Sequence, residues 1–409
     1  MRGTVVYPKT SVACVDVLSV KGAVPINCRA SGNEIIPALA PRLLKEGGYT
    51  GITFACYSRA AERFFLCSGG NVYASGNGCD FSLLSPLAGE RQFAVEEYDG
   101  GEKRFVLVTS AACLCHDGTS FKVLADVKAG LACGVMRCGR LFGADEENGY
   151  KLRWSGEGGA LDSKEGISGA GWLLNDCRYG KIVNVAELGG KLIVVGEYGI
   201  TVMSVNGNPE NFSVGNARFS TERIYGETAA VAGDKLLFFT ESGFYSFDGE
   251  KISEVTHGIQ NLVPERGPAA SFGGDYFTGV KVDGERAVFV YCRDGGAYIV
   301  LAEADAFAVN DGVYCFSRCG TTVLSGGGRF VFTSGKIDFG SRKNKVLKGI
   351  FFDGFASEII VECEEGKRTF TNIKGELSPH MRGYNFKITV KGDGKIENVK
   401  ACAEVLNEV

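Results

Sequence analysis

The chain has 409 residues, of which 45% are hydrophobic and 22% charged, so it is long enough to bury a sizeable core. With 44 Lys and Arg residues against 48 Asp and Glu residues, the chain lacks the excess positive charge that proteins use to bind nucleic-acid phosphates. There is no N-terminal apolar stretch of signal-peptide length and no run approaching the roughly 18 uncharged residues of a membrane span, so we expect folding in a cytoplasm, no sequence-specific nucleic-acid binding and no membrane contact.

Glycine is the compositional outlier, with 58 residues, whereas proline is scarce at 9 and aromatic residues are plentiful at 11%. The glycines punctuate apolar runs, which is typical of many tight turns between short strands. The 15 cysteines are odd in number, and several lie inside apolar runs, where a free thiol behaves as a small hydrophobe. We therefore expect reduced thiols.

The first 50 residues contain one candidate short helix, residues 36–46, although Pro41 interrupts it. After them, hairpin units recur that consist of a glycine, an apolar strand, a turn and an aromatic-containing strand. They cover residues 63–75, 104–124, 140–154, 191–205, 235–247, 286–300 and 312–332. Their starts lie 26 to 51 residues apart, centred near the roughly 40- to 45-residue period of a propeller blade.

The repeat is clearest where Asp117-Gly118 superposes on Asp248-Gly249, 131 residues later, or about three periods of 44. Asp-Gly between alternating strands favours a tight hairpin turn in which both central residues have positive φ. Phe244 and Phe247, in the strand that precedes the second pair, flank the turns at its two ends, and we expect them to pack between blades.

We therefore predict an all-β fold in which residues 1–340 form a β-propeller of six or seven blades. Within it, residues 1–50 form an N-terminal extension or a strand that closes the ring.

Near residue 341 the glycine rhythm stops, and the basic cluster Ser341-Arg342-Lys343-Asn344-Lys345 precedes a new set of strands. The expected strands cover residues 346–352, 358–363, 369–373, 384–390 and 396–403. About five strands suit a small β-sandwich, so we predict a C-terminal β-sandwich domain over residues 341–409. The basic cluster is interpreted as a solvated linker.

Two groups of residues are of types that could bind a metal or catalyse a reaction. Cys113, Cys115 and His116, followed by Cys133 and Cys138, superficially suggest a zinc site, but their spacing is wrong for Cys-x-x-Cys knuckles. We expect Cys113 and Cys115 to share one strand face and His116 to occupy a turn. Neither a metal nor a cofactor is predicted.

The acidic run Asp145-Glu146-Glu147, near Trp154, can be tested against the paired carboxylates of propeller glycosidases. Consecutive residues cannot all face one site, so the run is interpreted as a solvated hairpin tip. His257 is interpreted as a turn residue, and no Gly-x-Ser-x-Gly elbow is present. We predict no catalytic residue and no enzymatic activity.

Residues 139–262 resemble the propeller proteins of tailed bacteriophages and prophages, which are tail nozzle or tail accessory components. The matching pieces are Arg140-Leu141-Phe142-Gly143-Ala144, Leu152-Arg153-Trp154-Ser155, Ile182-Val183-Asn184-Val185-Ala186-Glu187-Leu188-Gly189-Gly190-Lys191-Leu192-Ile193-Val194, Tyr198-Gly199-Ile200, Asn208-Pro209-Glu210-Asn211-Phe212 and Phe238-Phe239-Thr240-Glu241-Ser242-Gly243-Phe244-Tyr245-Ser246-Phe247-Asp248-Gly249. Residues 381–388 also look like the final β-domain strand of such proteins.

The resemblance implies a non-enzymatic virion structural protein, a tail or head-to-tail component. Such a protein acts through contacts with other virion proteins and with further copies of itself in a ring oligomer. It would lie in the bacterial host cytoplasm during assembly and then in the virion. Two alternatives stay open. A host-encoded propeller binding module for a protein or glycan predicts an exposed aromatic cluster on one face, and a glycan-active hydrolase predicts convergent carboxylates in the central funnel.

Overall fold

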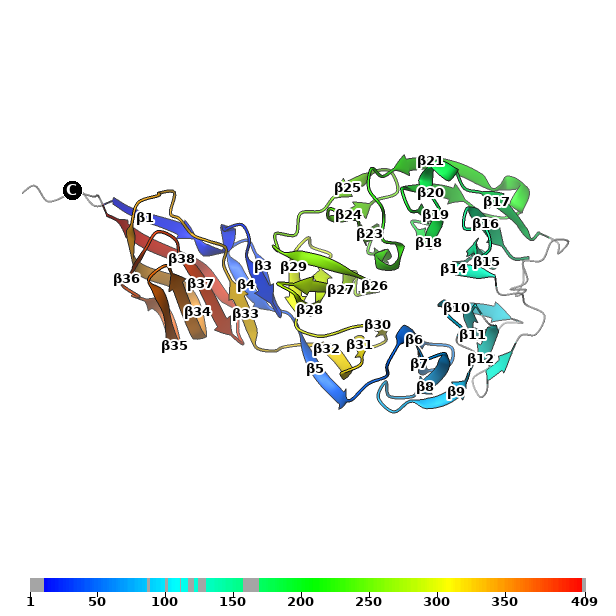
Figure 1. Cartoon of the computed structure of the whole chain (residues 1–409), viewed down its shortest axis with the longest axis horizontal. Coiled ribbons are helices and arrows are strands. Elements are labelled where there is room, and N and C mark those ends of the chain that lie inside the picture. Colours follow the sequence, from blue (N-terminus) through cyan, green and yellow to red (C-terminus); the bar gives the residue numbers. More distant parts are fainter. Residues whose placement is uncertain are drawn as a thin grey trace, which may run out of the picture.

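Figure 1 shows the computed structural model, which describes residues 11–86, 89–99, 102–110, 112–116, 121–123, 130–156 and 169–406. These residues form a ring of β-sheets and an elongated second body beside it. The predicted all-β propeller is confirmed. Among the described residues, no helix is long and apolar enough to cross a membrane.

The propeller consists of four-stranded antiparallel units arranged around a centre. Six of these units are separate sheets, of which the first two are β6 (Ile52–Ser58), β7 (Arg63–Ser68), β8 (Asn71–Ser75) and β9 (Ser82–Ser85), and β10 (Gln92–Asp99), β11 (Glu102–Thr109), β12 (Cys113–His116) and β13 (Phe121–Val123). The next two are β14 (Leu131–Arg137), β15 (Arg140–Asp145), β16 (Lys151–Trp154) and β17 (Gly171–Leu174), and β18 (Ile182–Leu188), β19 (Lys191–Gly196), β20 (Gly199–Ser204) and β21 (Ser213–Phe219). The last two are β22 (Ala230–Ala232), β23 (Lys235–Phe239), β24 (Phe244–Phe247) and β25 (Ile252–Glu254), and β30 (Ala306–Val309), β31 (Val313–Ser317), β32 (Gly320–Gly326) and β5 (Leu39–Glu46). A further four-stranded unit, β26 (Leu262–Phe272), β27 (Asp275–Val282), β28 (Glu285–Tyr291) and β29 (Ala297–Val300), continues into the second body. The first strands of all these units contact one another in cyclic order, so the ring is closed.

The closing blade combines the two ends of the propeller segment. Strand β5 pairs antiparallel with β32 and is therefore the fourth strand of the blade that begins with β30. The short helix expected over residues 36–46 is therefore wrong, because this stretch supplies the missing fourth strand. Pro41 is tolerated because β32 is the partner of β5 in the described sheet, and an edge strand can lack one backbone donor.

Alternating side chains of each inner strand pack against the two neighbouring blades. Leu192 and Val194 join the core shared with β15 and β16, whereas Ile193 and Val195 join the core shared with β23 and β24. Phe244 and Phe247 also divide in this way, the first toward β27 and β28 and the second toward β19 and β20. Their predicted packing between blades is confirmed.

The turn at Asp248-Gly249 differs in detail from the predicted tight hairpin. Gly249 has φ of 97°, whereas Asp248 does not lie in the left-handed region. The Asp248 carboxylate instead accepts bonds from the backbone N–H groups of Glu250 and Lys251, both at 2.9 Å, and these bonds lower its pKa. The matching pair Asp117-Gly118 lies outside the described residues.

The second body is built from both ends of the chain. Its elements are β1 (Ser11–Asp16), the 3-10 helix η1 (Val17–Ser19), β2 (Val24–Ile26), β3 (Cys28–Ser31), β4 (Glu34–Pro37), β33 (Phe330–Thr333), β34 (Lys345–Cys363), β35 (Gly366–Leu377), β36 (Met381–Gly383), β37 (Lys387–Gly392) and β38 (Ile396–Val405). Residues 1–50 were expected to be an N-terminal extension of the propeller or a strand that closes its ring. Strand β5 closes the ring, whereas β1 to β4 lie in the second body, and β33 precedes the expected boundary at residue 341.

A small β-sandwich is not confirmed, because the strands follow one continuous hydrogen-bonded path, β2-β33-β37-β34-β38-β4-β3. Two expected strands, residues 346–352 and 358–363, are a single strand, β34, which changes register with its partners around Gly354. Gly354 has φ of 122°, which an L side chain rarely adopts. The sheet encloses one core that includes Phe332, Ile359 and Ala401.

Strand β2 joins the propeller and the second body. Ile26 pairs in parallel with Ile299 of β29, while Val24 to Ile26 pair antiparallel with β33. The neighbouring Asn27 N–H also donates to the Ile299 carbonyl at 2.8 Å. The two bodies therefore share one hydrogen-bonded sheet, in which β2 lies between β29 of the propeller and β33 of the second body.

Two further expectations are corrected in this body. Lys345 is not part of a solvated linker: it is fully buried, and its Nζ donates to the carbonyls of Lys343 and Tyr384 at 2.7 Å each. Cys14 and Cys402 lie directly opposite on β1 and β38 and form a disulfide, so the expectation of reduced thiols is wrong for this pair. The other 13 cysteines, all within the described ranges, form no disulfide.

Candidate functional site: a funnel at the propeller centre

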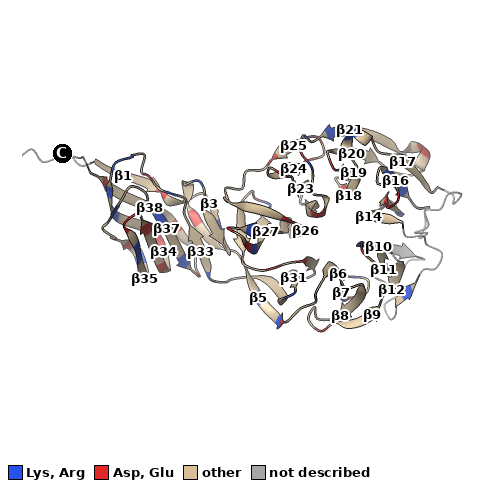
Figure 2. Cartoon of the chain, viewed as in Figure 1, with Lys and Arg blue, Asp and Glu red and all other residues tan. Residues whose placement is uncertain are grey.

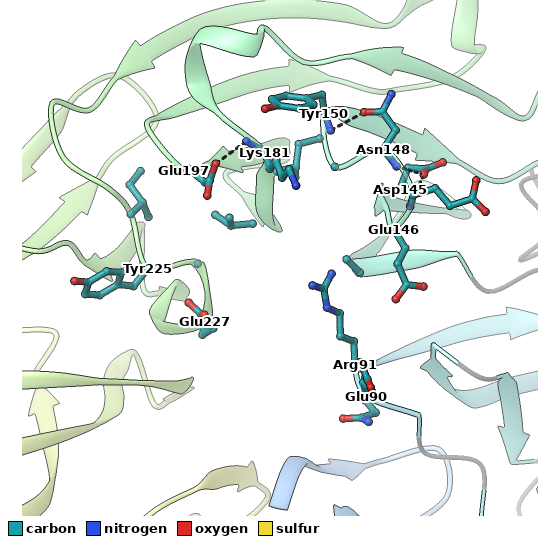
Figure 3. Close-up of a pocket in the computed structure, with 18 of the residues that line it drawn as sticks. Glu90, Arg91, Asp145, Glu146, Asn148, Tyr150, Lys181, Glu197, Tyr225 and Glu227 are labelled. Carbon is teal, nitrogen blue, oxygen red and sulfur yellow. Dashed lines mark hydrogen bonds between the residues drawn. The ribbon is translucent and has the colours of Figure 1, made fainter. Parts of the chain in front are cut away.

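Strands β6, β10, β14 and β18 begin at the same face of the propeller, here called the funnel face. A cavity of about 810 Å³ opens there, called the funnel (Figure 3). It is lined by Thr53, Glu90, Arg91, Gln92, Ala132, Asp145, Glu146, Glu147, Asn148, Gly149, Tyr150, Lys181, Ile182, Val183, Glu197, Arg223, Ile224, Tyr225, Gly226 and Glu227. A second cavity of about 600 Å³ shares six of these residues, so the funnel leads into the central channel.

Asp145 is held in place by the blade that carries it. As the last residue of β15 it is 8% exposed, and its carboxylate contacts Arg153 at 3.2 Å. The same carboxylate accepts bonds from the backbone N–H groups of Glu147 and Asn148, at 3.0 and 2.8 Å. The predicted solvated hairpin tip is thus wrong for Asp145 and correct in position only for Glu146 and Glu147, which are exposed on the turn.

Glu197 is a second anchored carboxylate. It accepts a bond from the Arg223 guanidinium at 2.7 Å and from the backbone N–H of Lys181 at 3.1 Å. These bonds link the β19–β20 turn to the segment before β18 and to the segment before β22. The role of Glu197 in the ring is therefore to hold three loops of the funnel face together.

Three other carboxylates of the funnel, Glu90, Glu146 and Glu227, are exposed. Within the described part of the chain, none of them forms a side-chain ion pair. Figure 3 shows Glu146 and Glu227 on opposite sides of the opening, with Arg91 extending into it. Since six Asp and Glu residues line the funnel against three Lys and Arg residues, its charge is predominantly negative.

Deeper in the channel, Arg286 is surrounded by three acidic side chains. Its guanidinium contacts Glu265 at 2.9 Å, Glu303 at 3.3 Å and Asp305 at 2.8 Å. Burial acts to lower the pKa of Arg286, but the bonds to Glu265 and Asp305 outweigh it and raise the pKa. Because these carboxylates come from β26 and from the link to β30, the cluster joins two neighbouring blades.

An aromatic shelf, formed by Tyr179, Tyr198 and Phe219, adjoins the funnel. Tyr198 is 38% exposed and Phe219 is 60% exposed, and the rings of Tyr179 and Phe219 lie 6.4 Å apart. The Tyr198 N–H donates to the Tyr179 carbonyl at 2.8 Å, and Tyr198 directly follows the funnel residue Glu197. Three separate segments supply these residues, so no local sequence pattern signals the shelf.

Cys113, Cys115 and His116, which were considered as zinc ligands, pack in the apolar cores between blades. Cys113 and Cys115 share one face of β12, as predicted, and are buried in the core between neighbouring blades. His116 is not in a turn but ends β12, where it is buried beside the rings of Phe65 and Phe121. Across the described ranges, no cluster of three or more His, Cys, Asp or Glu residues could hold a metal ion.

The other two cysteines of the supposed zinc motif lie apart from Cys113. Cys133 is on β14, and Cys138 is exposed in the β14–β15 turn, where its thiol donates to the Asn206 side chain at 3.3 Å. His257 lies between β25 and β26, consistent with its predicted turn position, and its Nδ1 accepts a bond from the Ile259 N–H at 3.3 Å. Burial lowers the pKa of His257.

Comparison with known proteins gives likeness of fold alone. No family model matches the chain, and no curated protein matches it. Similar solved structures include the N-terminal domain of Nup159, at 10% identity, covering 75% of this chain and 98% of that chain with a TM-score of 0.43. The β-propeller domain of Myceliophteria thermophila Cps50 (Swd1) has 9% identity and a TM-score of 0.47, and the match covers 69% of this chain and 98% of that chain.

A third similar structure is the extracellular domain of the putative hybrid two-component system BT4673 from B. thetaiotaomicron. Its identity is 10% and its TM-score 0.47, and the match covers 85% of this chain and 47% of that chain. The present chain thus spans about half the length of that protein.

Proposed function

We propose that the chain is a non-enzymatic structural protein of a tailed bacteriophage or prophage particle, a tail or head-to-tail component that acts through protein–protein contacts. It assembles in the bacterial host cytoplasm and then resides in the virion. The observation that carries this proposal is the shared sheet between propeller and second body. Because β2 is hydrogen-bonded to both, the two bodies form one stiff unit that can present contact surfaces at both ends.

The distribution of charge supports contacts between such units. Residues 38–328, which form the propeller, contain 26 Lys and Arg residues against 35 Asp and Glu residues. Residues 11–37 and 329–406, which form the second body, contain 16 against 12. Charged residues of both signs lie along both bodies in Figure 2, and opposite net charges at the two ends favour head-to-tail association between copies.

Light scattering of the purified protein over a concentration series tests this function, first alone and then with the products of neighbouring genes. We expect a ring of defined mass, or a stable complex with a neighbouring portal or tail protein. A protein that stays monomeric at every concentration and ignores these neighbours would refute the virion function.

A second candidate is a host-encoded propeller module that binds a protein or glycan, and the aromatic shelf specifically favours it. Exposed Tyr198 and Phe219 beside a cavity are the feature that such a module requires. This candidate predicts a monomer that retains a glycan or protein ligand through the funnel face. A monomer that binds such a ligand, and whose Tyr198→Ala variant no longer binds it, would favour this candidate over the virion function.

A further inference from the structure

The funnel and the aromatic shelf form one continuous surface. Lys181 and Glu197 line the funnel, and each lies within two residues of a shelf tyrosine, Tyr179 or Tyr198. The Tyr198 backbone is fixed by hydrogen bonds to Tyr179 and to Ser220, both at 2.8 Å. The shelf is therefore a preorganised extension of the cavity wall, so a ligand could contact both without rearrangement of the backbone.

The charges that are already satisfied can be separated from those that are available. Asp145 and Glu197 are held by arginines and serve the fold. Glu146 and Glu227, on opposite sides of the opening, are exposed and have no ion-pair partner among the described residues. They can therefore accept a cation without the loss of a structural contact.

The extent of the surface argues for a chain rather than a small molecule. The funnel alone, at about 810 Å³, is large enough for a small ligand, but the exposed residues Tyr198 and Phe219 extend the surface beyond its lining: Tyr198 follows the lining residue Glu197, and Phe219 pairs with Gly199. Large aromatic side chains are common anchors in protein interfaces, where they pack against apolar groups of the partner. An extended segment can place an apolar side chain on the shelf and a cationic one in the funnel.

We propose that the funnel face is a docking site for an extended peptide segment of a partner protein that carries Lys or Arg beside apolar residues. The cationic side chains contact Glu146 and Glu227, beside Arg91, which extends into the same opening, and the apolar side chains pack on Tyr198 and Phe219. This inference rests on the proposed function, since it names the chemistry of one partner surface.

The experiment uses the full chain and three fluorescent ten-residue peptides, with binding measured by fluorescence anisotropy. One peptide combines lysines with apolar residues, the second has glutamates in place of the lysines, and the third has serines in place of the apolar residues. We expect the first to bind at least about tenfold more tightly than either of the others, and to bind more weakly at high salt.

Variants locate the binding. The double variant Glu146→Gln/Glu227→Gln should weaken binding of the lysine–apolar peptide about five- to tenfold, and Phe219→Ala should weaken it by a similar factor. Glu376→Gln is the matched control, because Glu376 is an exposed carboxylate on β35 of the second body. It should leave the affinity unchanged, and thermal melts of all variants should match that of the wild type.

Equal affinity for the lysine and glutamate peptides, or no effect of the double variant, would overturn the proposal. It would also be overturned if the same substitutions abolish self-association in the absence of peptide, since a second copy would then occupy the face. Assembly with neighbouring gene products that survives a failed peptide experiment would refute this docking site and leave the proposed function standing.

Discussion

Loss of the Cys14–Cys402 disulfide should destabilise the protein markedly, because the bridge links strands at opposite ends of the chain. The two cysteines are 388 residues apart in sequence. In the loop-closure description of an unfolded chain, a cross-link of this span removes entropy worth about 6 kcal/mol at 25 °C. Measured effects fall below this limit, so the double variant Cys14→Ser/Cys402→Ser should lower the free energy of unfolding by about 2–5 kcal/mol.

The assay combines thiol counting with urea unfolding. Protein purified in air without reductant should show 13 reactive thiols in denaturant, and all 15 after reduction. The unfolding midpoint of the wild type should fall when reductant is added, whereas that of the double variant should not change. Cys138→Ser is the control, because Cys138 is an exposed free cysteine.

Two results would refute this reasoning. One is a count of 15 thiols before reduction, which would mean that the bridge does not form. The other is a wild-type urea midpoint that is the same with and without reductant, which would mean that the disulfide does not stabilise the folded protein by restricting the unfolded chain.

Three other substitutions test the ring and its loops. Arg286→Met removes the guanidinium from Glu303, Asp305 and Glu265, of which Glu265 keeps only the 3.9 Å contact with Lys281, and should cost about 1–3 kcal/mol in urea unfolding, whereas Arg318→Met, at an exposed position, should cost less than about 0.5 kcal/mol. Because burial lowers the pKa of His257 in the folded protein, stability should be complete above about pH 6.5 and decrease as the pH falls through the lowered pKa; His257→Gln should remove this step from the pH dependence of the urea midpoint. Phe65→Ala removes a fully buried ring between two blades and should cost about 3–5 kcal/mol by the same measurement, while Leu83→Ala, 60% exposed, should be nearly neutral; a cost of under about 1 kcal/mol for Phe65→Ala would contradict the packing.

Much of the propeller could be predicted from local signals. The predicted hairpins at residues 63–75 and 140–154 coincide with β7–β8 and β15–β16, because an apolar run bounded by glycine turns is a property of adjacent residues. The same rhythm led to a misplacement at residues 312–332. There β33 leaves the last blade for the second body, and β5 takes the place beside β32.

The candidate site was less accessible to such reasoning. The run Asp145-Glu146-Glu147 was noticed as an acidic cluster, but its interpretation as a uniformly solvated tip missed that Asp145 is buried against Arg153. The shelf residues Tyr179, Tyr198 and Phe219 drew no attention because each belongs to a different segment. Their proximity depends on how the chain returns to the funnel face.

By itself, the sequence determined the all-β class, the blade repeat and the alternation that packs each blade between its neighbours, since these follow from the spacing of apolar and turn residues within one or two strands. The sequence also offered residues 1–50 as an extension or a ring-closing strand, but only the tertiary structure decided that β5 within them closes the ring, which residues from the two ends share the second body, and which cysteines meet. These depend on pairing between segments up to 388 residues apart. The local pattern of apolar and turn residues in a strand does not indicate which distant strand it will pair with.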